Sequence, residues 1–200
     1  MKRIFISFLI FFVGSFLVQT KALSYSSNPE DFISKVIDEA KVILSSSSSS
    51  KEKAEKLSQI ALKTVDVKGL AYYTLGKKRK EITPEELKKY EDLFEKYFLK
   101  SFTSRLTDYS DPKINVLSSE VVNNKYTIVK TMLLKTDKRP EVKIDWRVYT
   151  KDPNNPLIRD LIIEGLSLAR TQKEEFASVL SANNNDINAL FSILEKFVNK

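Results

Sequence analysis

Apolar residues recur at steps of three and four through the middle of the chain, in a stripe rich in aromatic rings. Thr83 supplies a helix N-cap, Pro84 suits the first helical position, and Glu86 completes a capping box with Thr83. The spacing predicts a long helix over residues 83–106 with one apolar face. The residues of that face are Leu87, Tyr90, Leu93, Phe94, Tyr97, Phe98, Phe102 and Leu106.

Three shorter helices are predicted before it, separated by capping residues and by a run of six serines. Asn28-Pro29 and Ser50 are the expected starts of the first two. The serine run is typical of a flexible polar connector. Gly76 suits a left-handed helix end because it has no side chain. The three helices are expected over residues 28–44, 50–65 and 66–76.

Alternation of apolar and polar residues replaces helical spacing after Asp111-Pro112. Turn residues separate the alternating segments, which predicts an antiparallel meander. The third segment has Ile144, Trp146 and Val148 on one face and charged residues or tyrosine on the other, so one side of the sheet is expected to be dry. The three strands are expected at Ile114–Val122, Tyr126–Leu134 and Glu141–Thr150.

The segment Leu157–Phe176 is expected to join the sheet to the helices that cover it. A fourth strand runs into Glu164-Gly165, and Thr171 with Glu174 forms a capping box that predicts the start of a helix at Thr171. A last helix follows near residue 187. The pattern therefore predicts an α+β fold, in which helices cover a curved, mainly antiparallel sheet of about four strands around an apolar pocket.

The first 22 residues have the form of a secretory signal peptide. Lys2 and Arg3 precede an apolar run that ends at Val18, and Ala22 offers a small residue at the cleavage position. The run is shorter than the roughly 20 residues of a spanning helix. We expect cleavage after Ala22, with an uncleaved anchor as the alternative, and a single domain over residues 23–200 in the periplasm.

The chain has no cysteine and no histidine. Disulfides, thiolate chemistry and every nucleophile that depends on histidine are therefore excluded. Asp160 and Glu164 are the carboxylates of the sheet-to-helix junction, and we expect them to bond backbone amides near Gly165 or to pair with Arg159 or Arg170. Ser167 is expected to be a turn or cap residue. No enzyme activity, metal or cofactor is predicted.

Two segments carry a resemblance to a known family. The first is the pattern D-x-x-x-E-G-x-S at residues 160–167, followed by Phe176 on the next helix, and the second is Val65–Phe102. Both resemble the MlaC family of periplasmic phospholipid-binding proteins. The chain departs from the family pattern at Arg79, near a position that commonly holds an aromatic residue. The resemblance implies a mixed α+β unit whose curved sheet and helices enclose a lipid pocket.

The resemblance also implies a function. Members of this family are soluble carriers that shuttle phospholipid between an outer-membrane lipoprotein and porin complex and an inner-membrane ABC transporter with an MCE-domain subunit, which maintains the lipid asymmetry of the outer membrane. We therefore expect phospholipid as cargo, a monomer, and no nucleic-acid partner. A phospholipid has on the order of 30 methylenes, whose exposure to water costs about 24 kcal/mol at roughly 0.8 kcal/mol each.

Apolar residues of the dry sheet face and of the helical stripes are the predicted pocket, although each fits plain core equally well. Three alternatives stay open: a relative tied to hopanoid metabolism that carries another lipid, a periplasmic adaptor that docks through the basic cluster Lys77–Lys80, and a hydrolase that uses Asp160 and Glu164. The predicted lipid-binding residues are Leu70, Tyr73, Phe94, Tyr97, Phe98, Ile128, Met132, Ile144, Trp146, Val148 and Leu166.

Overall fold

The computed structural model describes residues 25–107, 109–137 and 139–200, so the expected signal peptide lies outside the described residues. In these residues, helices and strands are combined as the sequence predicted, with four α-helices and one short 3-10 helix before the sheet and two α-helices after it. The helices are α1 (Pro29–Leu44), α2 (Ser50–Thr64), α3 (Val67–Leu75), the 3-10 helix η1 (Gly76–Lys80), α4 (Pro84–Leu106), α5 (Leu168–Ala182) and α6 (Ile187–Val198). The strands are β1 (Ile114–Asn123), β2 (Tyr126–Leu133), β3 (Val142–Tyr149), β4 (Leu157–Ile163) and β5 (Leu166–Ser167).

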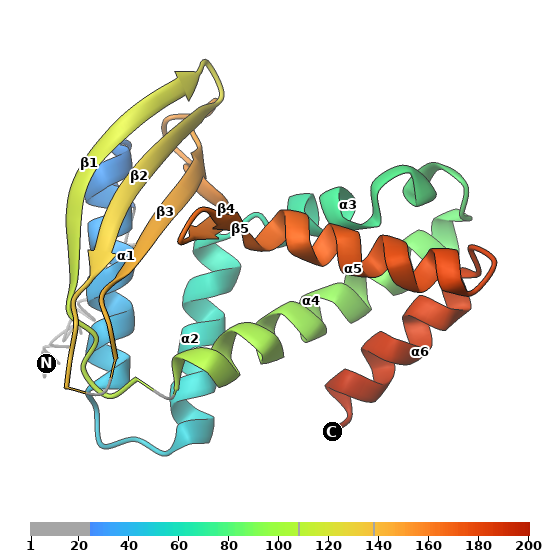
Figure 1. The fold of residues 1–200 in the computed structure, drawn as a ribbon, viewed down its shortest axis with the longest axis horizontal. Coiled ribbons are helices and arrows are strands. Elements are labelled where there is room, and N and C mark those ends of the chain that lie inside the picture. The colour runs from blue at the N-terminus through green and yellow to red at the C-terminus, as the bar shows by residue number, and fades with distance from the viewer. Residues whose placement is uncertain (1–24, 108, 138) are drawn as a thin grey trace, which may run out of the picture.

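The sheet is open and antiparallel, and its strand order follows the chain from β1 to β5. It has one strand more than expected, because the two residues of β5 pair back onto β4. The register shifts between Val116 and Ser118 on β1, and again between Arg147 and Val148 on β3. Such irregularities bend strands and increase their twist, and Figure 1 shows the long strands strongly curved.

One face of the sheet packs against α1, which lies along it in Figure 1. Phe32 and Ile33 are fully buried there, against Val129 of β2 and Val148 of β3. Ile158 of β4 completes this cluster. We call it the α1 core, and it accounts for the dry sheet face that alternation predicted.

A second cluster, the helical core, joins α3, α4, α5 and α6, which lie together in Figure 1. Its rings come from the aromatic stripe of α4 and from Phe176 of α5, which meets Tyr90 and Phe94 edge-on at 6.4 and 6.3 Å between centroids. The Tyr90 hydroxyl lies 2.8 Å from that of Thr74, and burial raises the pKa of Tyr90 well above its usual value. These rings fill the interior between the helices, as ordinary core residues do.

The start of α5 differs from the prediction. The helix begins at Leu168, and Ser167 is its N-cap, with a side-chain oxygen that accepts a bond from the Arg170 amide at 3.1 Å. Because Asp160 also accepts from the Ala169 amide, two first-turn donors are satisfied without Thr171. Thr171 lies inside the helix and donates its hydroxyl to the Ser167 carbonyl. The helix therefore starts three residues earlier than the capping-box pattern indicated.

The start of α2 is also shifted, by one residue. Ser49, not Ser50, is its N-cap, and Ser49 forms a capping box with Glu52. Gly76 ends α3 with φ +61°, a positive value that glycine adopts readily. The turn between β4 and β5 was not predicted as a hairpin, and its residues Glu164 and Gly165 have φ +50° and +82°. Two central residues with positive φ are what a tight two-residue hairpin turn requires.

We expect the α1 core to dominate the stability of the sheet. Ile33→Ala removes a side chain with 0% exposure, and should lower the free energy of unfolding by about 2–5 kcal/mol. Ile193→Ala is the matched control, because Ile193 is 46% exposed on α6, and it should cost less than about 1 kcal/mol. Urea unfolding monitored by circular dichroism measures both. Equal losses would show that α1 is not packed as described.

Candidate functional site

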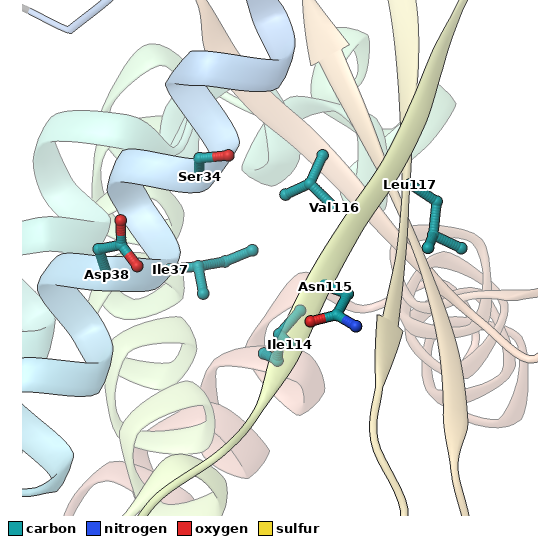
Figure 2. A pocket seen from close by; sticks show the side chains of 7 residues that line it. All are labelled: Ser34, Ile37, Asp38, Ile114, Asn115, Val116 and Leu117. Atoms are coloured by element: carbon teal, nitrogen blue, oxygen red, sulfur yellow. The ribbon is translucent and has the colours of Figure 1, made fainter.

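Two hollows open on the surface of the described chain. The first, about 370 Å³, lies between α1 and the edge strand β1. Figure 2 shows Ile37 of α1 directed toward Ile114 and Val116 of β1, while Leu117 points to the other side of the strand. Ser34 and Asp38 of α1 form the polar side of this hollow. It is a shallow groove along the α1 core and has no cationic side chain in its wall.

The second hollow is larger, about 460 Å³, and lies where the sheet meets the helical core. We call it the arginine hollow, because three arginines from separate elements line it. Its wall is formed by Gly69, Leu70, Tyr72 and Tyr73 of α3, Arg79 of η1, Val122 and Asn123 of β1, Tyr126 of β2, Arg147 of β3, Arg159 and Asp160 of β4, and Ala169 of α5.

Asp66 fixes α3 against β4 at one side of this hollow. Its carboxylate accepts from the Gly69 amide at 2.9 Å as the helix N-cap, and from Arg159 Nε at 2.6 Å. A Cβ on Gly69 would come within 2.2 Å of Asp66 Oδ2, so only glycine permits this close approach. The Asp66 amide donates to the Ile158 carbonyl at 2.9 Å, which also ties the helix start to the strand.

Asp160 fixes α5 at the other side. It is 4% exposed, and accepts from the Ser167 hydroxyl at 2.6 Å and from the Ala169 amide at 3.0 Å. The nearest cation is Arg147, whose Nη1 lies 3.8 Å from Asp160 Oδ2. The expected structural role is therefore confirmed, but the partners are Arg147, the Ser167 hydroxyl and the Ala169 amide, not Arg159 or Arg170.

Glu164 does not converge with Asp160. Its side chain accepts from the Lys143 amide at the start of β3, so the two carboxylates serve different backbone bonds. Paired-acid chemistry requires two carboxyl groups that face one substrate. Among the described residues, no group of three or more His, Cys, Asp or Glu side chains is placed to hold a metal ion.

The structure separates the predicted pocket residues into five groups. Leu70 and Tyr73 line the arginine hollow, and Leu70 is also part of the helical core. Leu166 lies on β5 with 59% exposure. The remaining residues divide between the helical core (Phe94, Tyr97 and Phe98), the sheet face toward α1 (Ile144, Trp146 and Val148) and the opposite sheet face (Ile128 and Met132).

The prediction that Ile128 and Met132 share a face with Trp146 and Val148 is wrong. Trp146 pairs with Val129, whereas Ile128 pairs with Arg147 and Met132 with Lys143. Side chains alternate between faces along a strand, so a one-residue difference in register reverses the assignment.

Two buried threonines account for the error. Thr127 and Thr131 occupy the buried face of β2 together with Val129 and Leu133, which made that face look polar in the sequence. Thr131 satisfies its hydroxyl by donating to the Ile144 carbonyl and accepting from the Trp146 indole.

Sequence reasoning did not place Arg147, Arg159 or Tyr126 at a candidate site, although all three line the arginine hollow. Arg147 was assigned to a solvated face by alternation, and Arg159 was considered only as a partner for Asp160 or Glu164. One signal was present: Arg147 and Tyr149 share the polar side of β3, and Tyr126 pairs with Tyr149 on the neighbouring strand.

The structure is that of a mixed α+β protein with a candidate binding hollow. The wall of this hollow contains both cationic and apolar side chains. The MlaC protein family matches residues 34–196, and the chain therefore belongs to this family. The resemblance stated for residues 160–167 and Val65–Phe102 is thereby confirmed. Comparison with curated proteins finds no matching sequence.

A solved structure shares the fold. It is a phospholipid-binding protein from Ralstonia solanacearum in complex with a phospholipid, determined at 1.53 Å resolution. The TM-score is 0.71 at 18% sequence identity, and the match covers 84% of this chain and 94% of that one. Among the residues that the structure of our chain describes, no helix is both long and apolar enough to cross a membrane.

We expect Asp160 to contribute to the stability of the folded protein. Asp160→Ala leaves the buried Ala169 amide without its acceptor, and should lower the free energy of unfolding by about 1–3 kcal/mol. Asp38→Ala, at an exposed position of α1, is the control and should change it by less than about 0.5 kcal/mol. Chemical denaturation at neutral pH measures both variants. An Asp160→Ala protein as stable as wild type would contradict this role.

Proposed function

We propose that this chain is a phospholipid carrier that takes up one lipid at the arginine hollow and moves it through the periplasm. Membership in the MlaC family is the observation that carries the proposal. The phospholipid bound by a solved protein of the same fold supports it. The carrier works between an outer-membrane lipoprotein and porin complex and an inner-membrane ABC transporter with an MCE-domain subunit.

A carrier of this kind needs shelter for acyl chains and no catalytic turnover. About 30 methylenes exposed to water cost about 24 kcal/mol, whereas a protein slot that is as apolar as the bilayer removes most of that barrier. We therefore propose a monomer without cofactor, whose only cargo is the lipid. The form of residues 1–22 supports delivery to the periplasm, because a basic start and an apolar run precede a small residue.

The hollow itself is small for two acyl chains. Ligand pockets span roughly 300–1,000 Å³, and about 460 Å³ falls in the lower half of that range. Leu70 belongs both to the wall of the hollow and to the helical core. We propose that the chains pass Leu70 and displace rings of α4, including Phe94, Tyr97 and Phe98, while Ile128 and Met132 cover them from the sheet.

Native mass spectrometry of the mature protein separates the candidate functions. A carrier retains phospholipid, a relative with another cargo retains a different lipid, and an adaptor that docks through Lys77–Lys80 retains none. The basic cluster supports the adaptor only as a surface feature, since Lys78 already pairs with Glu81 at 3.5 Å. Mature protein that carries no lipid after purification in mild buffer would reject the carrier.

We expect Leu70→Trp to reduce bound phospholipid at least about tenfold, because overpacking a filled site costs about 1–3 kcal/mol. Leu62→Trp is the matched control, as Leu62 is 48% exposed on α2. Phosphorus assay of lipid extracted from purified protein gives the ratio of lipid to protein.

A second variant provides an independent test in case Leu70→Trp does not fold. Tyr73→Ala changes a side chain that is 42% exposed at the rim of the hollow, so the fold should persist while lipid is held less tightly. Thermal unfolding of each variant is the folding check. Unchanged lipid content in both variants would place the cargo elsewhere.

A further inference from the structure

We propose that the arginine hollow binds the phosphodiester anion of the lipid, with Arg147 and Arg79 as the phosphate ligands and Arg159 as a positioning residue. This inference deepens the proposed function and rests on it. It adds a headgroup site to a carrier whose cargo is otherwise defined by its acyl chains.

The charge balance of the wall favours an anion. Three guanidinium groups line the hollow, and Asp160 is the one carboxylate among its lining residues. Asp160 is buried and already accepts two hydrogen bonds from Ser167 and Ala169. It is therefore well satisfied without a tight bond to Arg147. Because Asp66 compensates the charge of Arg159, the excess of positive charge in the wall comes from Arg79 and Arg147.

Arg147 is held loosely. Its side chain is 42% exposed, and its contact to Asp160 is 3.8 Å, longer than the 2.7–2.9 Å of a charge-assisted hydrogen bond. The planar guanidinium suits the two oxygens of a phosphate, which it binds through parallel N–H groups. Arg147 therefore has the position and the donors to accept an anionic ligand without breaking a tight internal pair.

Arg159 is held firmly. It donates to Asp66 at 2.6 Å and to the Tyr126 hydroxyl at 2.9 Å, and its guanidinium lies 3.8 Å from the centroid of the Tyr149 ring. Because the Tyr126 hydroxyl accepts from Arg159, its own proton is available for another acceptor. Arg159 thus fixes the orientation of Tyr126 at the wall, while Asp66 compensates the charge of Arg159.

Arg79 lies at the rim, on η1. It donates to the Tyr72 carbonyl at 3.4 Å in an exposed position, and its guanidinium lies 5.9 Å from the Tyr72 ring centroid. Both contacts are weak, so the side chain is able to turn toward a ligand. Arg79 and Arg147 reach the hollow from different elements, one from the helical side and one from the sheet.

The apolar part of the wall points to a lipid as the source of the phosphate. Leu70, Val122 and Ala169 line the hollow together with the arginines, and Leu70 is also part of the helical core. A free phosphate would gain nothing from these side chains. An anion joined to acyl chains uses both kinds of surface, as a glycerophospholipid does.

The test uses two probes with the same acyl chains, dihexanoylphosphatidylglycerol and dihexanoylglycerol, which differ in the phosphate headgroup. Binding to the delipidated mature protein is measured by isothermal titration calorimetry at low salt. We expect wild type to bind the phospholipid about 10- to 100-fold more tightly than the neutral lipid, since hydrogen bonds to charged groups contribute on that scale.

The double variant Arg79→Gln with Arg147→Gln should abolish this preference and leave the affinity for dihexanoylglycerol unchanged. Arg139→Gln with Arg170→Gln is the matched control, because it removes the same charge at exposed positions outside the hollow. Arg79→Gln alone, at the exposed rim, should reduce the preference for the phospholipid in part. This single variant keeps the proposal testable if the double variant does not fold.

Each contrary result has a distinct meaning. Equal affinity of wild type for both probes, or a preference that survives in the double variant, would overturn the phosphate site while the carrier stands. Binding of neither lipid by wild type would reject the carrier itself. A thermal shift with inorganic phosphate as large as that with dihexanoylphosphatidylglycerol would identify a free-phosphate site and overturn the lipid assignment.

Discussion

The contact between Asp160 and the start of α5 is the interaction on which the arrangement of the molecule depends. A buried carboxylate on β4 accepts from Ser167 and from the Ala169 amide, so the strand, the tight turn and the helix form one unit. A buried carboxylate is stable only when its oxygens are bonded. The need to satisfy Asp160 therefore sets the direction in which α5 leaves the sheet.

The Asp160 contact has a counterpart at the start of α3, where Asp66 binds both the Gly69 amide and Arg159. The two aspartates hold two helix N-termini against neighbouring residues of β4. A hollow remains at this junction, where the sheet meets the helical core. The arginine hollow is thus a consequence of how the sheet and the helices are joined.

The presence of two separate cores explains how the fold is kept stable next to the proposed site for cargo. The α1 core, with fully buried Phe32, Val129 and Val148, holds the sheet without contribution from the hollow. The helical core lies next to the hollow through Leu70, so the proposed rearrangement of its rings on lipid uptake does not involve the α1 core. In the proposed carrier, one core maintains the fold and the other adapts to the cargo.

Local pattern determined the elements of this protein, because helix spacing, strand alternation and caps such as Thr83 and Ser167 depend on neighbours a few residues away. The absence of histidine and cysteine likewise follows from the sequence alone. Tertiary structure alone decided the face of Ile128, because both faces of β2 carry apolar residues and only pairing with β3 distinguishes them. It also decided the meeting of Arg79, Arg147 and Arg159, since residues from three elements converge only when long-range packing brings those elements together.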